Sequence, residues 1–132
     1  MKLQWNAGSW FGGQLGCTAW VLAAALLTAF QEIRTGLILF VVFAIPNIIG
    51  LALWNRRENL SCYAATQLLL LLAGVFGLLA VYVLEHRHLW ESIQRGGSVS
   101  AKSAYVMILA VVSILMITFH LRFGRNSNGN AA

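Results

Sequence analysis

The sequence predicts an all-α integral membrane protein whose four spanning helices form an up-down-up-down bundle. Of its 132 residues, 59% are hydrophobic and 10% are charged, which is a larger apolar surplus than one soluble domain can bury. The apolar residues fall into four segments, each about as long as a membrane-spanning helix. None of these segments contains Asp, Glu, Lys or Arg, so the charged residues all lie between them or at the ends.

The predicted spans cover about residues 10–30, 36–54, 62–84 and 104–121. The loop between the first two spans has the sequence QEIRT and is so short that these spans must be antiparallel neighbours. Ser9 is a suitable N-cap for the first span. The transmembrane domain is therefore expected to occupy residues 1–125, and the polar tail at 126–132 is expected to be disordered.

Two features interrupt this regular pattern. Pro46 lies within the second span, where its missing N–H and its bulky ring should kink the helix, and the amide of Asn47 can bond backbone groups freed there. In the long third loop, Leu89, Trp90 and Ile93 share one helical face opposite charged residues. This pattern predicts a short helix that lies in the membrane interface and ends at Gly96 and Gly97.

Glycines recur at four-residue intervals on one face of the first span, at Gly8, Gly12 and Gly16. Small residues at this spacing allow the backbone of another helix to approach closely. We therefore predict that this face packs against a helix. The alternative is that glycine is simply common in membrane helices.

Polar side chains gather in the half of the membrane nearer the termini. Counted inward at 1.5 Å per residue, they lie roughly 5–11 Å inside that leaflet. An amide that faces hydrocarbon leaves its donors and acceptors unpaired, so we expect the three amides among them to turn towards one another. The layer either joins the helices or forms a binding site, and the sequence favours the first reading. Its members are Gln14, Thr18, Asn47, Thr66, Gln67 and Thr118.

Several kinds of chemistry find no support in the sequence. The spans lack the intramembrane acid on which proton- and cation-coupled carriers depend. Cys17 and Cys62 form no C-x-x-C motif, and the Glu85-x-x-His88 spacing lacks the second copy that a di-iron bundle needs. Because no nucleophile and base lie at a common depth, we expect no enzyme, no metal and no cofactor.

Basic residues give the chain a net charge of +5, spread between the spans rather than clustered on one face. This arrangement is typical of contact with lipid headgroups and not with nucleic acid. The strongest basic pair, Arg56 and Arg57, lies on the same side as both termini, and that side carries five Lys and Arg residues against four. The bias places both termini in the cytoplasm, in a cell membrane or bacterial inner membrane, but is small enough to leave dual insertion open.

The sequence alone does not fix a function. The pattern favours a small, non-enzymatic accessory or assembly subunit that associates with itself or with another membrane protein through helix–helix contacts. The alternative is a small oligomeric carrier or channel for a neutral or weakly polar solute, which would enter the polar layer beside Pro46.

Overall fold

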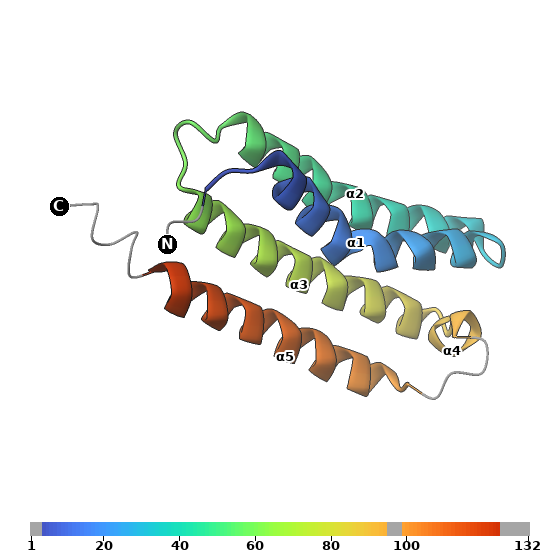
Figure 1. Ribbon diagram of the computed structural model, residues 1–132. Helices are drawn as coiled ribbons and strands as arrows, with labels where there is room; N and C mark the ends of the chain where they lie inside the picture. Colours follow the sequence, from blue (N-terminus) through green and yellow to red (C-terminus); the bar gives the residue numbers. More distant parts are fainter. Residues whose placement is uncertain (1–3, 95–98, 125–132) are drawn as a thin grey trace.

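Four long helices run alternately up and down in the computed structural model, which describes residues 4–94 and 99–124 (Figure 1). Each is long and apolar enough to cross a membrane, the last when counted together with a terminal π-helical turn. The prediction of an all-α, four-span bundle is therefore confirmed. The helices are α1 (Ala7–Ala29), α2 (Ile33–Asn55), α3 (Cys62–His86) and α5 (Ala101–Phe119), which continues into η1 (His120–Gly124).

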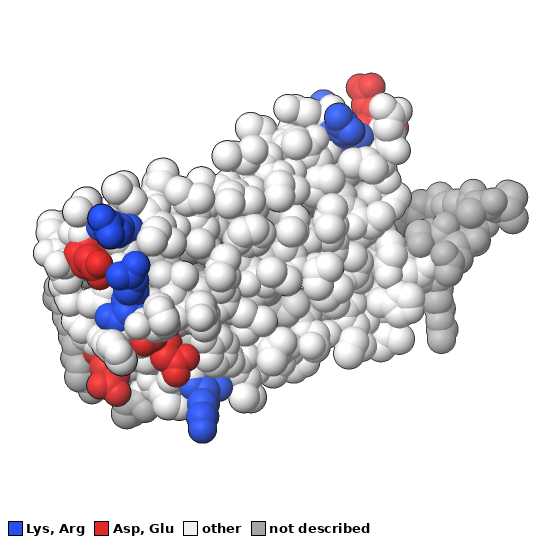
Figure 2. Space-filling model, turned by 180° about the vertical axis from the view of Figure 1, so that it is seen from behind, with Lys and Arg blue, Asp and Glu red and all other residues white. Residues whose placement is uncertain are grey.

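On the face shown in Figure 2, charged side chains gather at the two ends of the molecule, and none lies on the surface between them. Large hydrophobic side chains in this band are widely exposed, for example Leu26 at 58% and Ile48 at 65%. A small soluble protein rarely exposes so much apolar surface to water, whereas a membrane protein exposes such surface to lipid. The protein is a multi-pass integral membrane protein.

The helix starts follow local capping chemistry. The Asn6 side chain accepts a hydrogen bond of 3.0 Å from the backbone N–H of Ser9, so the N-cap of α1 is Asn6 and not Ser9 as predicted. Ser61 and Ser100 cap α3 and α5 in the same way. Each cap satisfies an N–H group that the helix itself leaves unpaired.

The third loop begins with a turn that only a few residue types adopt easily. His88 takes a left-handed conformation with a φ of 57°, and the N–H of Leu89 bonds the Leu84 carbonyl at 2.9 Å. This geometry ends α3 and redirects the chain into the short helix α4 (Trp90–Ile93). A short helix was predicted at this position. Gly96 and Gly97, which were expected to end it, lie outside the described residues.

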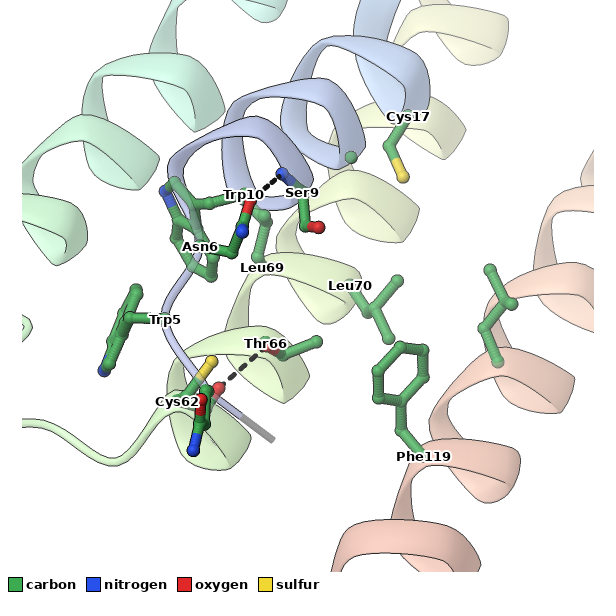
Figure 3. Close-up of a pocket in the computed structure, with 13 residues that line it drawn as sticks. Trp5, Asn6, Ser9, Trp10, Cys17, Cys62, Thr66, Leu69, Leu70 and Phe119 are labelled. Atoms are coloured by element: carbon green, nitrogen blue, oxygen red, sulfur yellow. Dashed lines mark hydrogen bonds between the residues drawn. The ribbon is translucent and has the colours of Figure 1, made fainter. Parts of the chain in front are cut away.

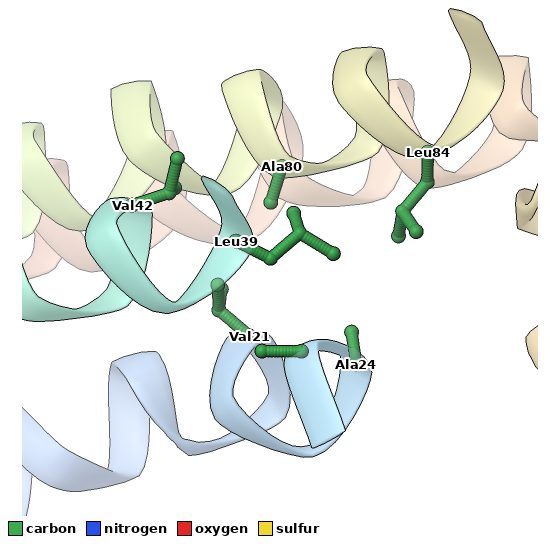
Figure 4. Packing of buried hydrophobic residues seen from close by; sticks show 7 residues of the cluster. Val21, Ala24, Leu39, Val42, Ala80 and Leu84 are labelled. Carbon is green, nitrogen blue, oxygen red and sulfur yellow. The ribbon is translucent and has the colours of Figure 1, made fainter. Parts of the chain in front are cut away.

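The apolar core forms between α1, α2 and α3. Figure 4 shows a cluster contributed by these three helices at the end of the bundle away from the termini. Leu89 and Trp90 of the third loop pack against this cluster. A second cluster lies at the end nearer the termini, around Trp10, Ala65 and Leu69. Neither cluster includes a residue of α5. The first cluster consists of Val21, Ala24, Ala25, Leu39, Val42, Ala80 and Leu84.

Helix α5 lies beside α3 and has few neighbours elsewhere (Figure 1). Along this fully described helix, Ala104 is the one buried residue. Val106, Ile114 and Ile117 are each more than half exposed, at 65%, 62% and 58%. Most of the circumference of α5 therefore faces the surroundings, and α1 and α5 leave a gap between them.

Candidate functional site

Three polar side chains connect α1 to α2 inside the bundle. The Gln14 amide nitrogen donates to the backbone oxygen of Asn47 at 2.8 Å and to its side-chain oxygen at 3.0 Å. The Asn47 amide nitrogen in turn donates to the Thr18 hydroxyl at 3.1 Å. Gln14 and Thr18 are only 5% and 4% exposed. The helical hairpin is therefore held together by a buried hydrogen-bond network.

Gly50 makes room for this network on α2. A Cβ atom at this position would lie 2.6 Å from Cδ of Gln14, so no larger residue fits without a shift. The Gly50 carbonyl also accepts a hydrogen bond of 3.1 Å from the Trp10 indole. The buried Oε1 of Gln14 has no conventional donor among the described residues, but it lies where the Cα–H of Gly50 can act as a weak one.

Helix α2 continues without a break through Pro46, which is buried. Proline lacks the N–H that a helix needs, so a carbonyl one turn earlier loses its partner. The Asn47 amide nitrogen donates to the nearby Phe43 carbonyl at 2.7 Å. Asn47 therefore bonds the backbone beside the proline at Phe43, and not at the Val42 carbonyl that Pro46 leaves without its usual donor, while it also bonds α1.

The other predicted members of the polar layer lie apart from this network. Gln67 does not turn towards Gln14 and Asn47 as expected, because its amide nitrogen donates to the Met116 carbonyl of α5 at 2.9 Å. Ala65 and Leu69 face the α1–α2 side, and Gln67 lies about 200° round the helix from each of them. The Thr66 hydroxyl bonds its own helix at Cys62, and Thr118 is exposed on α5.

The end of α5 contains an arrangement that the sequence analysis missed. The Tyr63 hydroxyl and Nδ1 of His120 are 2.6 Å apart, where the chain widens into the π-helix η1. Gly124 is buried against this pair, since a Cβ there would lie 2.7 Å from Nδ1 of His120. No spacing in the sequence pairs His120 with Tyr63, which lies 57 residues away.

The predicted glycine face of α1 packs against no other helix in the part of the chain that the structure describes. Among the described residues, nothing lies within 4 Å of a Cβ built at Gly12 or Gly16, and at Gly8 only the Asn6 side chain approaches, at 3.3 Å. Close approach occurs elsewhere in the hairpin. A Cβ at Gly36 would lie 2.7 Å from Cα of Ala29, so backbone meets backbone there.

These glycines belong to a longer ridge of small, exposed residues on the outer face of α1, which we call the α1 ridge. The spacing of its members places them on one side of the helix over about 22 Å. Leu15 and Leu26 flank it and are also exposed, at 53% and 58%. The α1 ridge consists of Gly8, Gly12, Gly16, Ala19 and Ala23.

Beside the ridge, a groove lies between α1 and α5 with α3 as its floor (Figure 3). It consists of a cavity of about 270 Å³ near the termini and one of about 330 Å³ nearer the membrane centre. The two cavities share Cys17, Leu70 and Leu115 as lining residues, so they adjoin along the same three helices. We call this feature the α1–α5 groove.

Two further hollows lie at the ends of the bundle. One of about 360 Å³ borders Glu85, His88 and Lys102, and a shallow one of about 390 Å³ borders Gln67 and His120. Gln14 and Asn47 line none of the four cavities described here. No three His, Cys, Asp or Glu side chains within residues 4–94 and 99–124 lie close enough together to hold a metal ion.

The predicted topology residues lie beside an aromatic group. The Arg57 guanidinium stacks over the Trp54 ring at 4.6 Å and donates to the Trp54 carbonyl at 3.1 Å, while Arg56 is exposed. Trp54 contacts the rings of Trp5 and Phe11. An aromatic cluster next to basic residues is typical of a membrane–water boundary. The side of the membrane that this boundary faces stays a prediction.

No protein family, curated protein or solved structure matches this chain.

Proposed function

We propose that the protein is a non-enzymatic membrane subunit that associates with a second copy of itself through the α1 ridge. The observation that carries this proposal is the open space above Gly12 and Gly16. In lipid, helices gain little by hiding apolar side chains, so association depends on small residues that let backbones approach. The α1 ridge supplies such a surface, and no described part of the chain covers it.

A second copy is the partner that fits the ridge best by shape. A groove-free surface made of glycine and alanine packs most closely against another small-residue surface, and a two-fold axis brings two identical ridges together. The described chain offers no charged side chain near Gly12 or Ala19 that would oppose such pairing. Another membrane protein with a small-residue face would be bound by the same contacts.

The carrier or channel alternative stays a prediction, and the geometry gives it less support. A solute site beside Pro46 needs space next to the polar side chains. Gln14 and Asn47 instead touch each other directly and line none of the cavities described above. Because these two side chains are in contact, they support the interpretation that the polar layer joins the helices.

The proposal is tested by the mass of the full chain in mild detergent. We expect a dimer for the native protein and a monomer for the double variant Gly12→Leu with Ala19→Leu, because both substitutions fill the ridge. Leucine is inserted into membranes as readily as glycine, so insertion should be unchanged. Gly13→Leu is the matched control, since Gly13 is also free of neighbours but lines the α1–α5 groove instead. A dimer that survives the double variant would contradict the proposal.

A further inference from the structure

We infer that the α1–α5 groove binds one acyl chain of a glycerophospholipid from the leaflet nearer the termini. Its walls are formed by α1 and α5 and its floor by α3 (Figure 3). No charged residue lines either of its two cavities. The groove lies within the spans and opens towards the surrounding hydrocarbon, so an apolar molecule has direct access.

The length of the groove matches one leaflet. Along α1 its lining runs from Ser9 to Trp20, which is about 16 Å at the rise of an α-helix. The hydrocarbon of one leaflet is about 15 Å deep, half the thickness of a typical bilayer core. A lipid chain that enters at the membrane boundary therefore reaches the end of the groove near the bilayer centre.

Side chains from both walls lie over the floor at the inner end of the groove. Trp20 of α1 and Ile108 of α5 both lie over Gly77 of α3, where a Cβ would be 3.3 Å from the Trp20 ring and 3.7 Å from Ile108. A transmembrane helix would need a groove that continues across the whole membrane. It is also about 10–12 Å wide with its side chains, which is too wide for cavities of this size. A single hydrocarbon chain is narrow enough for these cavities, and it does not need a groove that continues across the whole membrane.

The outer end of the groove carries neutral polar side chains. Asn6 and Ser9 line this mouth, and neither Nδ2 of Asn6 nor Oγ of Ser9 has a hydrogen-bond partner among the described residues. Both groups can donate a hydrogen bond. The ester carbonyls of a glycerolipid are acceptors that lie at the depth of this mouth, at the top of the acyl chain. The polar mouth and apolar interior therefore match the two parts of one lipid.

Glycines along α1 leave open the space that the groove occupies. Gly13 and Gly16 contribute no side chain to the groove wall, and nothing among the described residues lies within 4 Å of a Cβ at either position. Gly12 is equally free of neighbours but lines neither cavity. Gly13→Leu should therefore fill the groove while Gly12→Leu leaves it open, which gives a matched pair of variants.

The test uses the full chain in nanodiscs of phosphatidylcholine that carries a photoactivatable diazirine midway along one acyl chain. Adducts are mapped by peptide mass spectrometry after illumination. We expect labelling of Cys17 and Leu115 to exceed that of Ile48 by about fivefold, equivalent to about 1 kcal/mol. Ile48 is the reference because it is 65% exposed on the side of α2 opposite the buried Pro46, and its neighbour Asn47 bonds Thr18 of α1, so its depth is similar to that of Cys17. Native mass spectrometry should also show one retained phospholipid per chain.

The variants separate the lipid site from the α1 ridge. Gly13→Leu and Cys17→Phe should each abolish the labelling preference, and Gly12→Leu should retain it while it weakens dimerisation. Circular dichroism checks that each variant is folded. Equal labelling of Cys17 and Ile48 in the native protein would overturn the inference, because only ordinary boundary lipid would then be present. Protection of the groove from labelling would overturn it as well, because a protein partner would then fill it.

Discussion

The α1–α2 hairpin and the α3–α5 pair are both antiparallel, but they are held together differently. The hairpin has a buried hydrogen-bond network around Gln14 and Asn47 and a backbone contact between Gly36 and Ala29. The α3–α5 pair has one amide hydrogen bond, from Gln67 to Met116, exposed hydroxyl contacts from Tyr63 to His120 and from Tyr105 to Glu85, and a glycine contact at Gly74 that meets the side chain of Val112. The hairpin therefore has the closer backbone approach and the more deeply buried hydrogen bonds.

This difference shows what holds helices together in lipid. Both pairs are rich in apolar side chains, yet such side chains are almost as well solvated by lipid tails as by each other. Close backbone approach and buried interhelical hydrogen bonds distinguish the hairpin from the α3–α5 pair. The helix with fewer of them, α5, leaves most of its surface exposed and forms one wall of the open groove.

The largest expected loss of stability comes from a substitution at the closest contact of the hairpin. In Gly36→Ala, the new methyl group would lie 2.7 Å from Cα and 2.9 Å from the backbone nitrogen of Ala29, and backbone cannot move aside as a side-chain tip can. We expect a loss of about 1–3 kcal/mol in the free energy of unfolding, measured by SDS titration in mixed micelles. Gly13→Ala is the control and should cost nothing. Equal behaviour of the two variants would refute the tight hairpin.

A smaller loss of stability is expected when the polar contacts of the hairpin and of the α3–α5 pair are removed in turn. Gln14→Leu removes two interhelical hydrogen bonds and Gln67→Leu removes one. At about 0.6–1 kcal/mol for each interhelical bond, Gln14→Leu should lower the free energy of unfolding about twice as much as Gln67→Leu. The measurement is the same SDS titration. If Gln14→Leu were neutral or stabilising, the network would not join the helices, and the reading of the polar layer as a binding site would gain support.

The smallest effect concerns the loops that tie the hairpin to the end of α3. Arg87 and Glu32 approach to 3.7 Å, and their side chains are 42% and 39% exposed. Exposed ion pairs contribute about 0–1 kcal/mol and are screened by salt. Glu32→Gln should therefore shift the melting temperature by a few degrees at most, and high salt should remove the difference. A large shift that is insensitive to salt would instead point to the Glu32–Thr35 hydrogen bond.

The architecture was predictable because its causes are local. Four uncharged segments of spanning length follow from the printed order of residues, and so does the tight turn between α1 and α2. The short helix α4 was predicted from the spacing of its apolar residues. The start of α1 was missed by one turn because both Asn6 and Ser9 are good capping residues, and only the geometry shows that Asn6 accepts the bond.

The site was predictable only in part, because periodicity gives depth but not direction. Gln14, Asn47 and Gln67 lie at similar depths, yet the rotation of α3 turns Gln67 towards α5. The same limit applies to the glycines. Spacing places Gly12 and Gly16 on one face of α1, but it does not indicate that α2 packs against a different face. The groove depends on the separation of α1 and α5, which no local pattern encodes.

Cysteine cross-linking in native membranes tests most directly the central claim, that the α1 ridge pairs with a second copy. Ala19→Cys is placed in a chain in which Cys17 and Cys62 are changed to Ser, and Val106→Cys on the exposed face of α5 serves as the control. We expect a mild oxidant to link Ala19→Cys chains into dimers, to leave Val106→Cys chains monomeric, and to lose the link when Gly12→Leu is added. Equal cross-linking at the two positions, or a link that persists with Gly12→Leu, would contradict the account.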